Sequence, residues 1–497
     1  MLKVRDMRNL LLSTTAAVTF AAAATAQEGG QLQAAIEGGI QMMNAQGANI
    51  TYDSREVASD NSLIFNGFRM APEDDVDLEI STDWLRFSPS ADMEGGVTVT
   101  VAPMINVSVN DDEISFDIVV ESENFALTSN TFMGDMEAPR MTLAADSISA
   151  RNPDPDDPMI ERMDIRLDDL DFSFELDTAS GDSDAALSAA NMLIDMKVAD
   201  PDGPVLYDQR SETESVSMTF TGSNLPVGGD DEDVIAFFGE DGSFRLRVES
   251  GAGTSSMGAT RDLPVAIEGE GVGGSMEASL QDGILAYSTN LGAVSYVVTP
   301  DPNVLPLPPM DASLAALDLD LRTPVRPSES LQEAKFLLNL SELTVSDSAW
   351  SLIDPAGSIP RDPATLQIDL TSMMRLLVPL GQIQDTDSPT QAVEVDSVDI
   401  KRVHMDAAGA EVDADGSLAI DNSGPIPFPN GSIDISVRGA QTLAEKLVNL
   451  GLVDEMQVGM VMGMLMAFAE QGDGPDHFTS TIEFKDGGVF ANGQPIQ

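Results

Sequence analysis

Cysteine is absent from the 497 residues, which excludes disulfide bonds, thiolate metal ligands and cysteine nucleophiles. Histidine is nearly absent: only His404 and His477 occur. A serine hydrolase needs a histidine beside its serine, and the serine run at 253–258 (GTSSMG) lacks the Gly-x-Ser-x-Gly spacing. With two Trp and four Tyr, side chains that stack on sugars are also scarce. We therefore predict a protein that is not an enzyme, with no catalytic residues and no bound cofactor or metal.

Basic residues are few, with 25 Lys and Arg against 83 Asp and Glu and a formal net charge of −58. A field of this sign repels the phosphates of nucleic acids and anionic lipid head groups, and it attracts divalent cations. Nucleic acid is therefore excluded as a partner. The 42% of apolar residues still suffices for a large core, so the acidity does not imply global disorder.

Long hydrophobic runs are missing except near the start. Three basic residues precede the apolar segment 10–24, and the tripeptide Ala-Thr-Ala ending at Ala26 is typical of a cleavage site. We expect a signal peptide over residues 1–26, cleaved near Ala26/Gln27. The alternative is a retained anchor, but the run is shorter than the roughly 20 residues of a spanning helix. No second segment is long enough for a stable transmembrane helix.

Alternating apolar and polar residues recur through most of the chain and predict strands with one apolar side. In the segment 163–177, the apolar side chains of Met163, Ile165 and Leu167 lie at odd-numbered positions, and those from Leu170 onward lie at even-numbered positions. A β-bulge at Asp168-Asp169 would reconcile the two halves. The fold class that follows is mainly β: a long curved antiparallel sheet or sandwich with a few packed helices.

Proline clusters at one place, with five prolines in 299–309 and two more at Pro324 and Pro327. We interpret residues 301–328 as a linker between a β-rich domain at 27–300 and a second β-rich domain with helices at 329–497. In the second domain, residues 371–380 are expected to form a short helix.

The last fifth of the chain holds the most regular pattern. From Val453 to Ala469, the side chains Met456, Met460, Met464 and Phe468 recur every fourth residue, which predicts a helix with an apolar face. We expect this face to pack on the sheet or to hold an apolar ligand, because methionines serve both as core filler and as adaptable binding surfaces. A closing hairpin follows at 479–492.

One acidic segment has the start of a calcium loop: Glu411, Asp413 and Asp415 alternate and precede Gly416. The twelfth position is Asn422 instead of the bidentate glutamate, and the flanking residues alternate as strands do. We favour a hairpin turn over a specific ion site.

Several short segments resemble a known family: Trp350–Pro355 (WSLIDP), Ile359–Leu366 (IPRDPATL), Gly409–Glu411, Pro427–Gly431 (PFPNG) and Phe490–Pro495 (FANGQP). They resemble an exported alphaproteobacterial family of domains of unknown function, number 2125. The resemblance covers 330–497 best. It implies a periplasmic, β-rich protein and gives no catalytic residues.

The spacing of Leu32, Ile36, Ile40 and Met43 predicts a short helix that ends near Gly47. A helix followed by many strands resembles the AsmA-like envelope proteins, some of which are thought to handle lipids. Those proteins are usually anchored in a membrane, whereas the leader of this chain has a cleavage site. The first functional hypothesis is a non-enzymatic periplasmic protein that shelters a lipid or another apolar envelope component. The second is a structural or assembly factor that contacts envelope proteins, its protein partner unknown. The third, and least favoured, is a hydrolase of cell-wall sugars or esters.

Overall fold

The computed structural model describes residues 31–72, 77–110, 115–133, 137–154, 159–200, 203–225, 242–385, 392–424 and 426–496. Strands make up most of this part of the chain, and the few helices are short. The ladders between its named strands are antiparallel in both units described below. The predicted mainly β fold with antiparallel pairing is therefore confirmed. The proposed signal peptide, residues 1–26, lies outside the described residues.

The chain divides into two compact units, Met1–Val227 with Thr260–Leu263, and Gly228–Ala259 with Pro264–Gln497. Among its described residues, the first unit has the helix α2 (Gln31–Ala45) and the 3-10 turn η1 (Thr131–Met133). Its strands are β1 (Ile50–Thr51), β2 (Ser54–Val57), β3 (Leu63–Met70), β4 (Asp77–Pro89), β5 (Val97–Val101), β6 (Met104–Asn110), β7 (Ser115–Glu123), β8 (Ala126–Ser129), β9 (Arg140–Arg151), β10 (Ile160–Asp177), β11 (Asp182–Ala199) and β12 (Val205–Ser223).

A closed apolar core lies at the start of the first unit. Helix α2 buries Ile36 and Ile40 against the strands, where Phe65 and Phe87 have no exposed surface. The rings of these two phenylalanines meet edge to face, with centroids 6.0 Å apart, a favourable geometry for aromatic pairs. A small apolar cavity of 160 Å³ adjoins this core beside Phe132. Here a helix does cover one face of a sheet.

Further along the first unit, the apolar side chains in each of strands β9 to β12 switch between odd-numbered and even-numbered positions part-way along the strand. Asp169 in β10 has a φ of 48° and Ser215 in β12 a φ of 47°. The pairing register places Asp169, Ala190 and Ser215 in one row across β10, β11 and β12. The predicted bulge at Asp168-Asp169 is wrong, because the register with both neighbouring strands is the same before and after this row. Since the neighbours change parity at the same level, no extra residue is needed.

Within the ranges that the structure describes, the helical elements of the second unit are α4 (Asp347–Trp350), η2 (Leu380–Asp385), α5 (Ala440–Asn449) and α6 (Glu455–Phe468). Its strands are β13 (Ser243–Ser250), β14 (Gly253–Met257), β15 (Val265–Gly271), β16 (Gly274–Gln281), β17 (Ile284–Leu291), β18 (Val294–Pro300), β19 (Met310–Leu314), β20 (Ala316–Pro324), β21 (Gln332–Val345), β22 (Ala364–Leu376), β23 (Val393–Ala407), β24 (Ala410–Asp421), β25 (Phe428–Arg438), β26 (Glu470–Gln471), β27 (His477–Lys485), β28 (Gly488–Ala491) and β29 (Gln494–Pro495).

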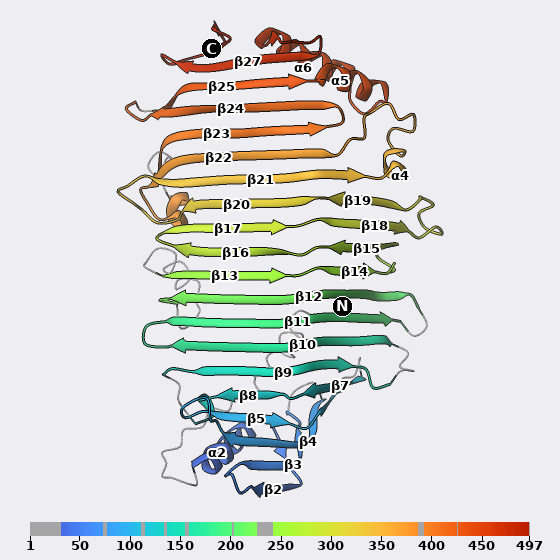
Figure 1. Ribbon diagram of the computed structural model, residues 1–497, viewed down its shortest axis with the longest axis vertical. Coiled ribbons are helices and arrows are strands. Elements are labelled where there is room, and N and C mark those ends of the chain that lie inside the picture. Colours follow the sequence, from blue (N-terminus) through green and yellow to red (C-terminus); the bar gives the residue numbers. More distant parts are fainter. Residues whose placement is uncertain are drawn as a thin grey trace. The chain divides into compact units, whose positions relative to one another are not determined.

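Figure 1 shows strands β20 to β25 side by side, each hydrogen-bonded to the next, with β27 following β25. The predicted closing hairpin is present as β27 and β28, joined by Asp486 and Gly487. Both joining residues have positive φ values, 52° and 74°, as a two-residue hairpin turn with the twist of the strands requires.

Two sequence-based predictions in this unit are wrong. The predicted linker 301–328 contains strands β19 and β20, which pair with β18, β17 and β21. Pro302, Pro306, Pro308 and Pro309 lie in the loop between β18 and β19, where no backbone N–H is needed for a ladder, whereas Pro324 ends strand β20 and Pro327 follows it. The division of the chain falls instead between Val227 and Gly228. The expected helix at 371–380 is mostly the end of strand β22, whose backbone groups pair with β21 and β23.

Candidate functional site

One face of the second unit's sheet is apolar, and the pairing register makes it continuous from strand to strand. On β21, Phe336 faces Leu321 of β20 and Leu370 of β22. We call this surface the apolar sheet face. It comprises Leu317, Leu319 and Leu321 on β20; Phe336, Leu338 and Leu340 on β21; Leu366, Ile368 and Leu370 on β22; Val398, Ile400, Val403 and Met405 on β23; Val412, Ala414 and Leu418 on β24; and Ile433, Ile435 and Val437 on β25.

The apolar sheet face remains partly open. Its side chains are half-buried, and Phe336 and Met405 are 36% and 39% exposed. Side chains between two packed layers have almost no exposed area, as with Phe65 and Phe87 in the first unit. Among the described helices, α4 has its main strand contact with β19 and α5 with β24. None of the described helices has its main contacts with β20 to β23, and the side chains of the face there stay partly exposed.

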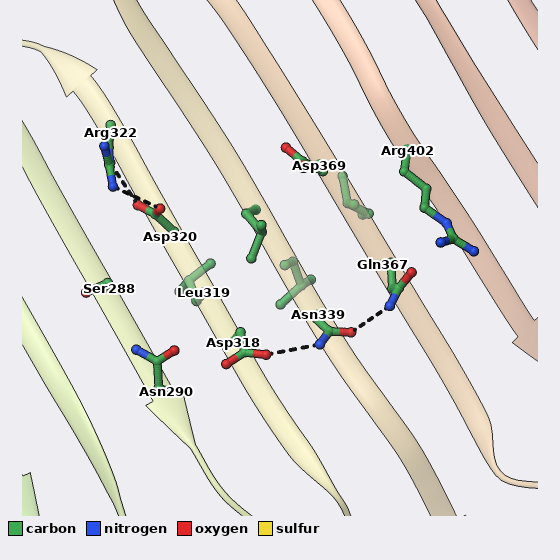
Figure 2. A pocket seen from close by; sticks show the side chains of 13 residues that line it. Ser288, Asn290, Asp318, Leu319, Asp320, Arg322, Asn339, Gln367, Asp369 and Arg402 are labelled. Carbon is green, nitrogen blue, oxygen red and sulfur yellow. Dashed lines mark hydrogen bonds and ion pairs between the residues drawn. The ribbon is translucent and has the colours of Figure 1, made fainter.

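The opposite face of the same strands carries a polar groove of 590 Å³ that extends from β17 to β23. In Figure 2, side chains from neighbouring strands form a hydrogen-bonded row across it. Gln367 Nε2 donates to Asn339 Oδ1 at 3.3 Å, and Asn339 Nδ2 donates to Asp318 Oδ2 at 3.0 Å. The polar side chains of the groove point away from the apolar sheet face, because successive side chains of a strand alternate, but Leu319, Leu338 and Ile368 of that face also contribute to the lining of the groove.

Asp320 lies in the polar groove between two cations, Arg322 and Lys335. Burial opposes the ionisation of this carboxyl, but the hydrogen bonds from Lys335 and Arg322 outweigh it and hold the pKa of Asp320 below its ordinary value. Asp320 is therefore ionised and fully engaged by protein groups.

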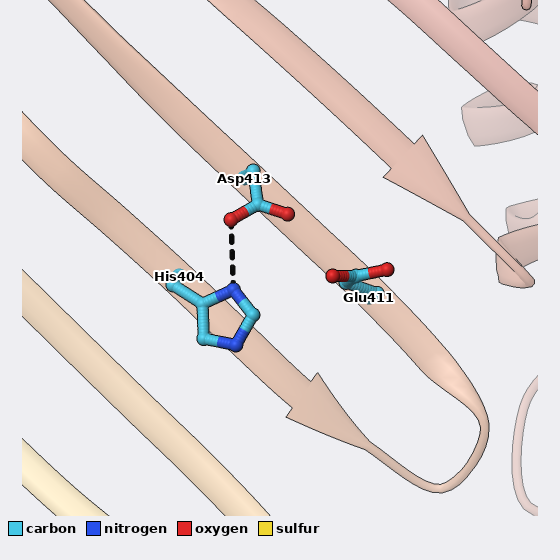
Figure 3. Close-up of side chains that lie close together, drawn as sticks. All are labelled: His404, Glu411 and Asp413. Atoms are coloured by element: carbon cyan, nitrogen blue, oxygen red, sulfur yellow. Dashed lines mark hydrogen bonds and ion pairs between the residues drawn. The ribbon is translucent and has the colours of Figure 1, made fainter.

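The weak calcium candidate has a different local structure from the one predicted. Glu411, Asp413 and Asp415 lie inside strand β24 and not in a hairpin turn, which is formed by Ala408 and Gly409. An extended strand cannot curl its side chains around an ion as a calcium loop does. Figure 3 shows a different grouping: His404 of β23 faces Asp413, and Glu411 lies next to them.

Ligand atoms of His404, Glu411 and Asp413 lie within 4.8 Å of one another, and each residue is half-buried. His404 Nδ1 and Asp413 Oδ1 are 2.8 Å apart, a hydrogen bond between them. Glu411 Oε2 also lies 3.8 Å from Arg438 Nε. The three side chains thus have the donor set of a divalent-cation site, and protein partners already engage them.

The second histidine, His477, is buried and contacts a serine. Its Nε2 lies 3.1 Å from Ser436 Oγ, while its Nδ1 accepts the backbone N–H of Asp473 at 3.0 Å. Because Nδ1 accepts, the ring proton must be on Nε2, which then donates to the serine. In this arrangement His477 cannot remove a proton from Ser436. The pair is therefore not arranged as a nucleophile with its general base.

The methionine-rich helix is present as α6, but its predicted packing on the sheet is wrong for two of the named residues. Met456 is 79% and Met460 62% exposed. Phe468, at the C-terminal end of the helix, is less exposed, and its carbonyl accepts a hydrogen bond from Ser480 of β27. The side chain of Met464 lies outside the described residues. Whether α6 binds an apolar ligand stays a prediction.

The segment 350–361, which carries part of the family resemblance, forms a loop held by its own hydrogen bonds. Asp354 is fully buried and accepts Ser358 Oγ at 2.9 Å and Ile359 N at 2.7 Å. Arg361 donates to the Asp354 carbonyl at 3.1 Å and pairs with Asp347. The backbone hydrogen bond from Ile359 is the main cause that lowers the pKa of Asp354. These residues stabilise the loop between β21 and β22.

Comparison with known proteins gives one match. The model of a bacterial family, described as an uncharacterized protein conserved in bacteria, matches residues 232–496, which is most of the second unit. No curated protein and no solved structure was found to match the chain. Within the described residues, no helix is both long and apolar enough to cross a membrane.

Proposed function

We propose that the second unit, through which the chain belongs to this bacterial family, DUF2125, binds an apolar ligand along the apolar sheet face. The acyl chain of a lipid is such a ligand. The protein acts as a non-enzymatic holder of an envelope component and works in the periplasm after removal of residues 1–26. The basic, apolar and Ala-Thr-Ala parts of the leader support this location.

The partial exposure of the apolar sheet face is the observation on which the proposal rests. Burial of apolar area contributes about 25 cal/mol per Å². A ligand that covers the exposed apolar area of several strands would therefore gain free energy of binding. Large continuous apolar surfaces on soluble proteins usually mark interaction sites. A flexible acyl chain can follow the rows of Leu, Ile and Val side chains across strands without needing a polar partner.

Native mass spectrometry of the mature chain purified from a bacterial periplasm tests the proposal. We expect lipid to co-purify with the wild type and to be lost in Leu366→Lys, which places a charge on the apolar sheet face between Leu340 and Met405. The matched control is Gln367→Lys, which adds the same charge one residue away on the polar face. A wild-type protein free of lipid, or equal lipid content in the two variants, would contradict the proposal.

A second function, an assembly factor that contacts envelope proteins, is favoured by one specific observation. Helix α6 is apolar nearly all round, and Met456, Met460 and Val461 are each more than 60% exposed. Such a helix usually packs against a partner. Crosslinking in the periplasm from position 460 would distinguish the two functions, because a lipid holder needs no stoichiometric protein partner.

A further inference from the structure

The polar groove has its own chemistry, independent of the apolar sheet face. It opens on the other side of β17, β20, β21, β22 and β23 and has a volume of 590 Å³. An apolar ligand on the opposite face would not reach its polar side chains, because successive side chains of a strand point to opposite sides, although Leu319, Leu338 and Ile368 contribute to both surfaces. What the groove binds is therefore a separate question from the proposed lipid binding.

Most of the polar side chains in the groove already have partners. Asp320 pairs with Arg322 and Lys335, and Asp318 accepts a hydrogen bond from Asn339. These groups hold each other in place and form a fixed polar wall. They leave little unmet charge for a ligand.

Two charged groups in the groove are different. Asp369 Oδ1 is buried and has no hydrogen-bond partner. Arg402 is exposed, and its guanidinium has no hydrogen bond or ion pair with any residue in the described ranges. The two residues face each other in the register of β22 and β23, yet their side chains diverge in Figure 2. An unsatisfied buried carboxylate oxygen is costly in a folded protein.

The missing partners define the ligand. A buried carboxylate oxygen requires an N–H donor, best a cationic one, and a guanidinium favours a carboxylate. No aromatic side chain lines the groove, so the stacking surface that sugars commonly use is missing. Gln367, whose Nε2 is engaged by Asn339, can accept a hydrogen bond from a peptide N–H through its Oε1. A molecule with an ammonium at one end and a carboxylate at the other meets all of these demands.

We propose that the polar groove binds a short peptide, a dipeptide in the simplest case, with its ammonium at Asp369 and its carboxylate at Arg402. An extended peptide advances about 3.4 Å per residue, so the charged ends of a dipeptide are about 7 Å apart, more than the strand spacing of about 4.8 Å. That length suits two side chains that start on adjacent strands and diverge. A free amino acid is too short to reach both.

Calorimetric titration of the mature chain with alanyl-alanine tests the site. We expect saturable binding that is weakened about tenfold or more when the ammonium is acetylated or the carboxylate is amidated, because each change removes a charge-assisted hydrogen bond. Free alanine and a neutral disaccharide should bind at least as weakly as the blocked peptides. Equal binding of the blocked and free peptides, preferential binding of the disaccharide, or no binding of alanyl-alanine would overturn the proposal.

Variants assign each charge to its end of the peptide. Asp369→Asn should abolish the preference for a free ammonium, and Arg402→Gln the preference for a free carboxylate. Two exposed positions on β23 provide matched controls, Asp396→Asn and Lys401→Gln, which change the net charge equally and should bind as the wild type does. Circular dichroism confirms that each variant is folded. Variants that retain both preferences would contradict the assignment, whatever the outcome of the lipid experiment.

Discussion

Replacing Phe336 with threonine should weaken the binding of a fatty acid by a calculable amount. Phe336 is 36% exposed on the apolar sheet face. A phenylalanine side chain presents about 200 Å², so about 70 Å² remains for a ligand to cover, worth about 1.8 kcal/mol at about 25 cal/mol per Å². Since threonine retains part of the contact, we expect a loss in affinity of about five- to twentyfold.

The next residue along β21 provides the control. Leu337 lines the polar groove on the other face, so Leu337→Thr removes a similar apolar side chain without touching the proposed ligand surface. The assay is a fluorescence titration of both variants with a fluorescent polyene fatty acid, at a temperature where unfolding curves show each variant folded. Equal affinities for Phe336→Thr and Leu337→Thr would refute the reasoning, because the ligand would then not lie on the apolar sheet face.

Further outcomes follow from other contacts. Hydrogen bonds lower the pKa of Asp354 from its ordinary value of 3.8, so its contribution to stability is present above that value and is lost as the pH falls through the lower, folded-state pKa. The advantage of wild type over Asp354→Asn in urea unfolding should therefore begin to decrease below about pH 4 and disappear only below the folded-state pKa. Asp476 accepts three hydrogen bonds from the first turn of α5, so Asp476→Ala should cost about 1 kcal/mol in urea unfolding, and the neighbouring Asp473→Ala much less. Met460→Gln should change thermal stability by less than about 0.5 kcal/mol, since the side chain is exposed; a cost of several kcal/mol would show that α6 is packed. Calcium titration should give the same weak binding for wild type and Asp413→Asn, because His404 already engages that carboxylate.

Alternation in the sequence was enough to predict the strands and their apolar side. Ile165 and Leu167 are half-buried, and Arg166 between them is exposed, as a period of two requires. The helix α2 was also predictable, because its apolar residues recur with helical spacing. The row through Asp169, where neighbouring strands switch together, could not be predicted. The sequence of each strand shows only the switch in that strand, and the pairing register is needed to see that the switches lie side by side.

The packing of α6 was predicted wrongly because apolar composition does not say what covers a helix. Residues 455–468 contain few polar side chains and have no distinct polar face, so the spacing of Met456 and Met460 gave no direction toward the sheet. The helix that does cover a sheet, α2, has a clear apolar side. The linker at 301–328 was predicted wrongly for a similar reason. A cluster of prolines is tolerated both in a long loop between two strands and in a linker between domains.

The polar groove was out of reach of sequence reasoning. Asn339, Gln367 and Arg402 each occupy an ordinary polar position in an alternating strand. They come together only because β21, β22 and β23 pair in one particular register, so that Asn339 faces Gln367 and Asp369 faces Arg402. A shift of two residues would keep every strand pattern intact and still separate these side chains. The sequence shows only that polar side chains alternate along each strand, and this alternation does not determine which residues of two neighbouring strands face each other.

The pairing of neighbouring strands in the second unit makes the length of its apolar surface adjustable. The apolar sheet face lies on six successive strands, β20 to β25, which at about 4.8 Å between neighbours gives a width of about 24 Å. Insertion or deletion of one hairpin would change that width by about 10 Å and leave the remaining pairs intact. Insertion or deletion of hairpins could thus fit the apolar surface to ligands of different lengths, and the side chains of the remaining strands would not have to change.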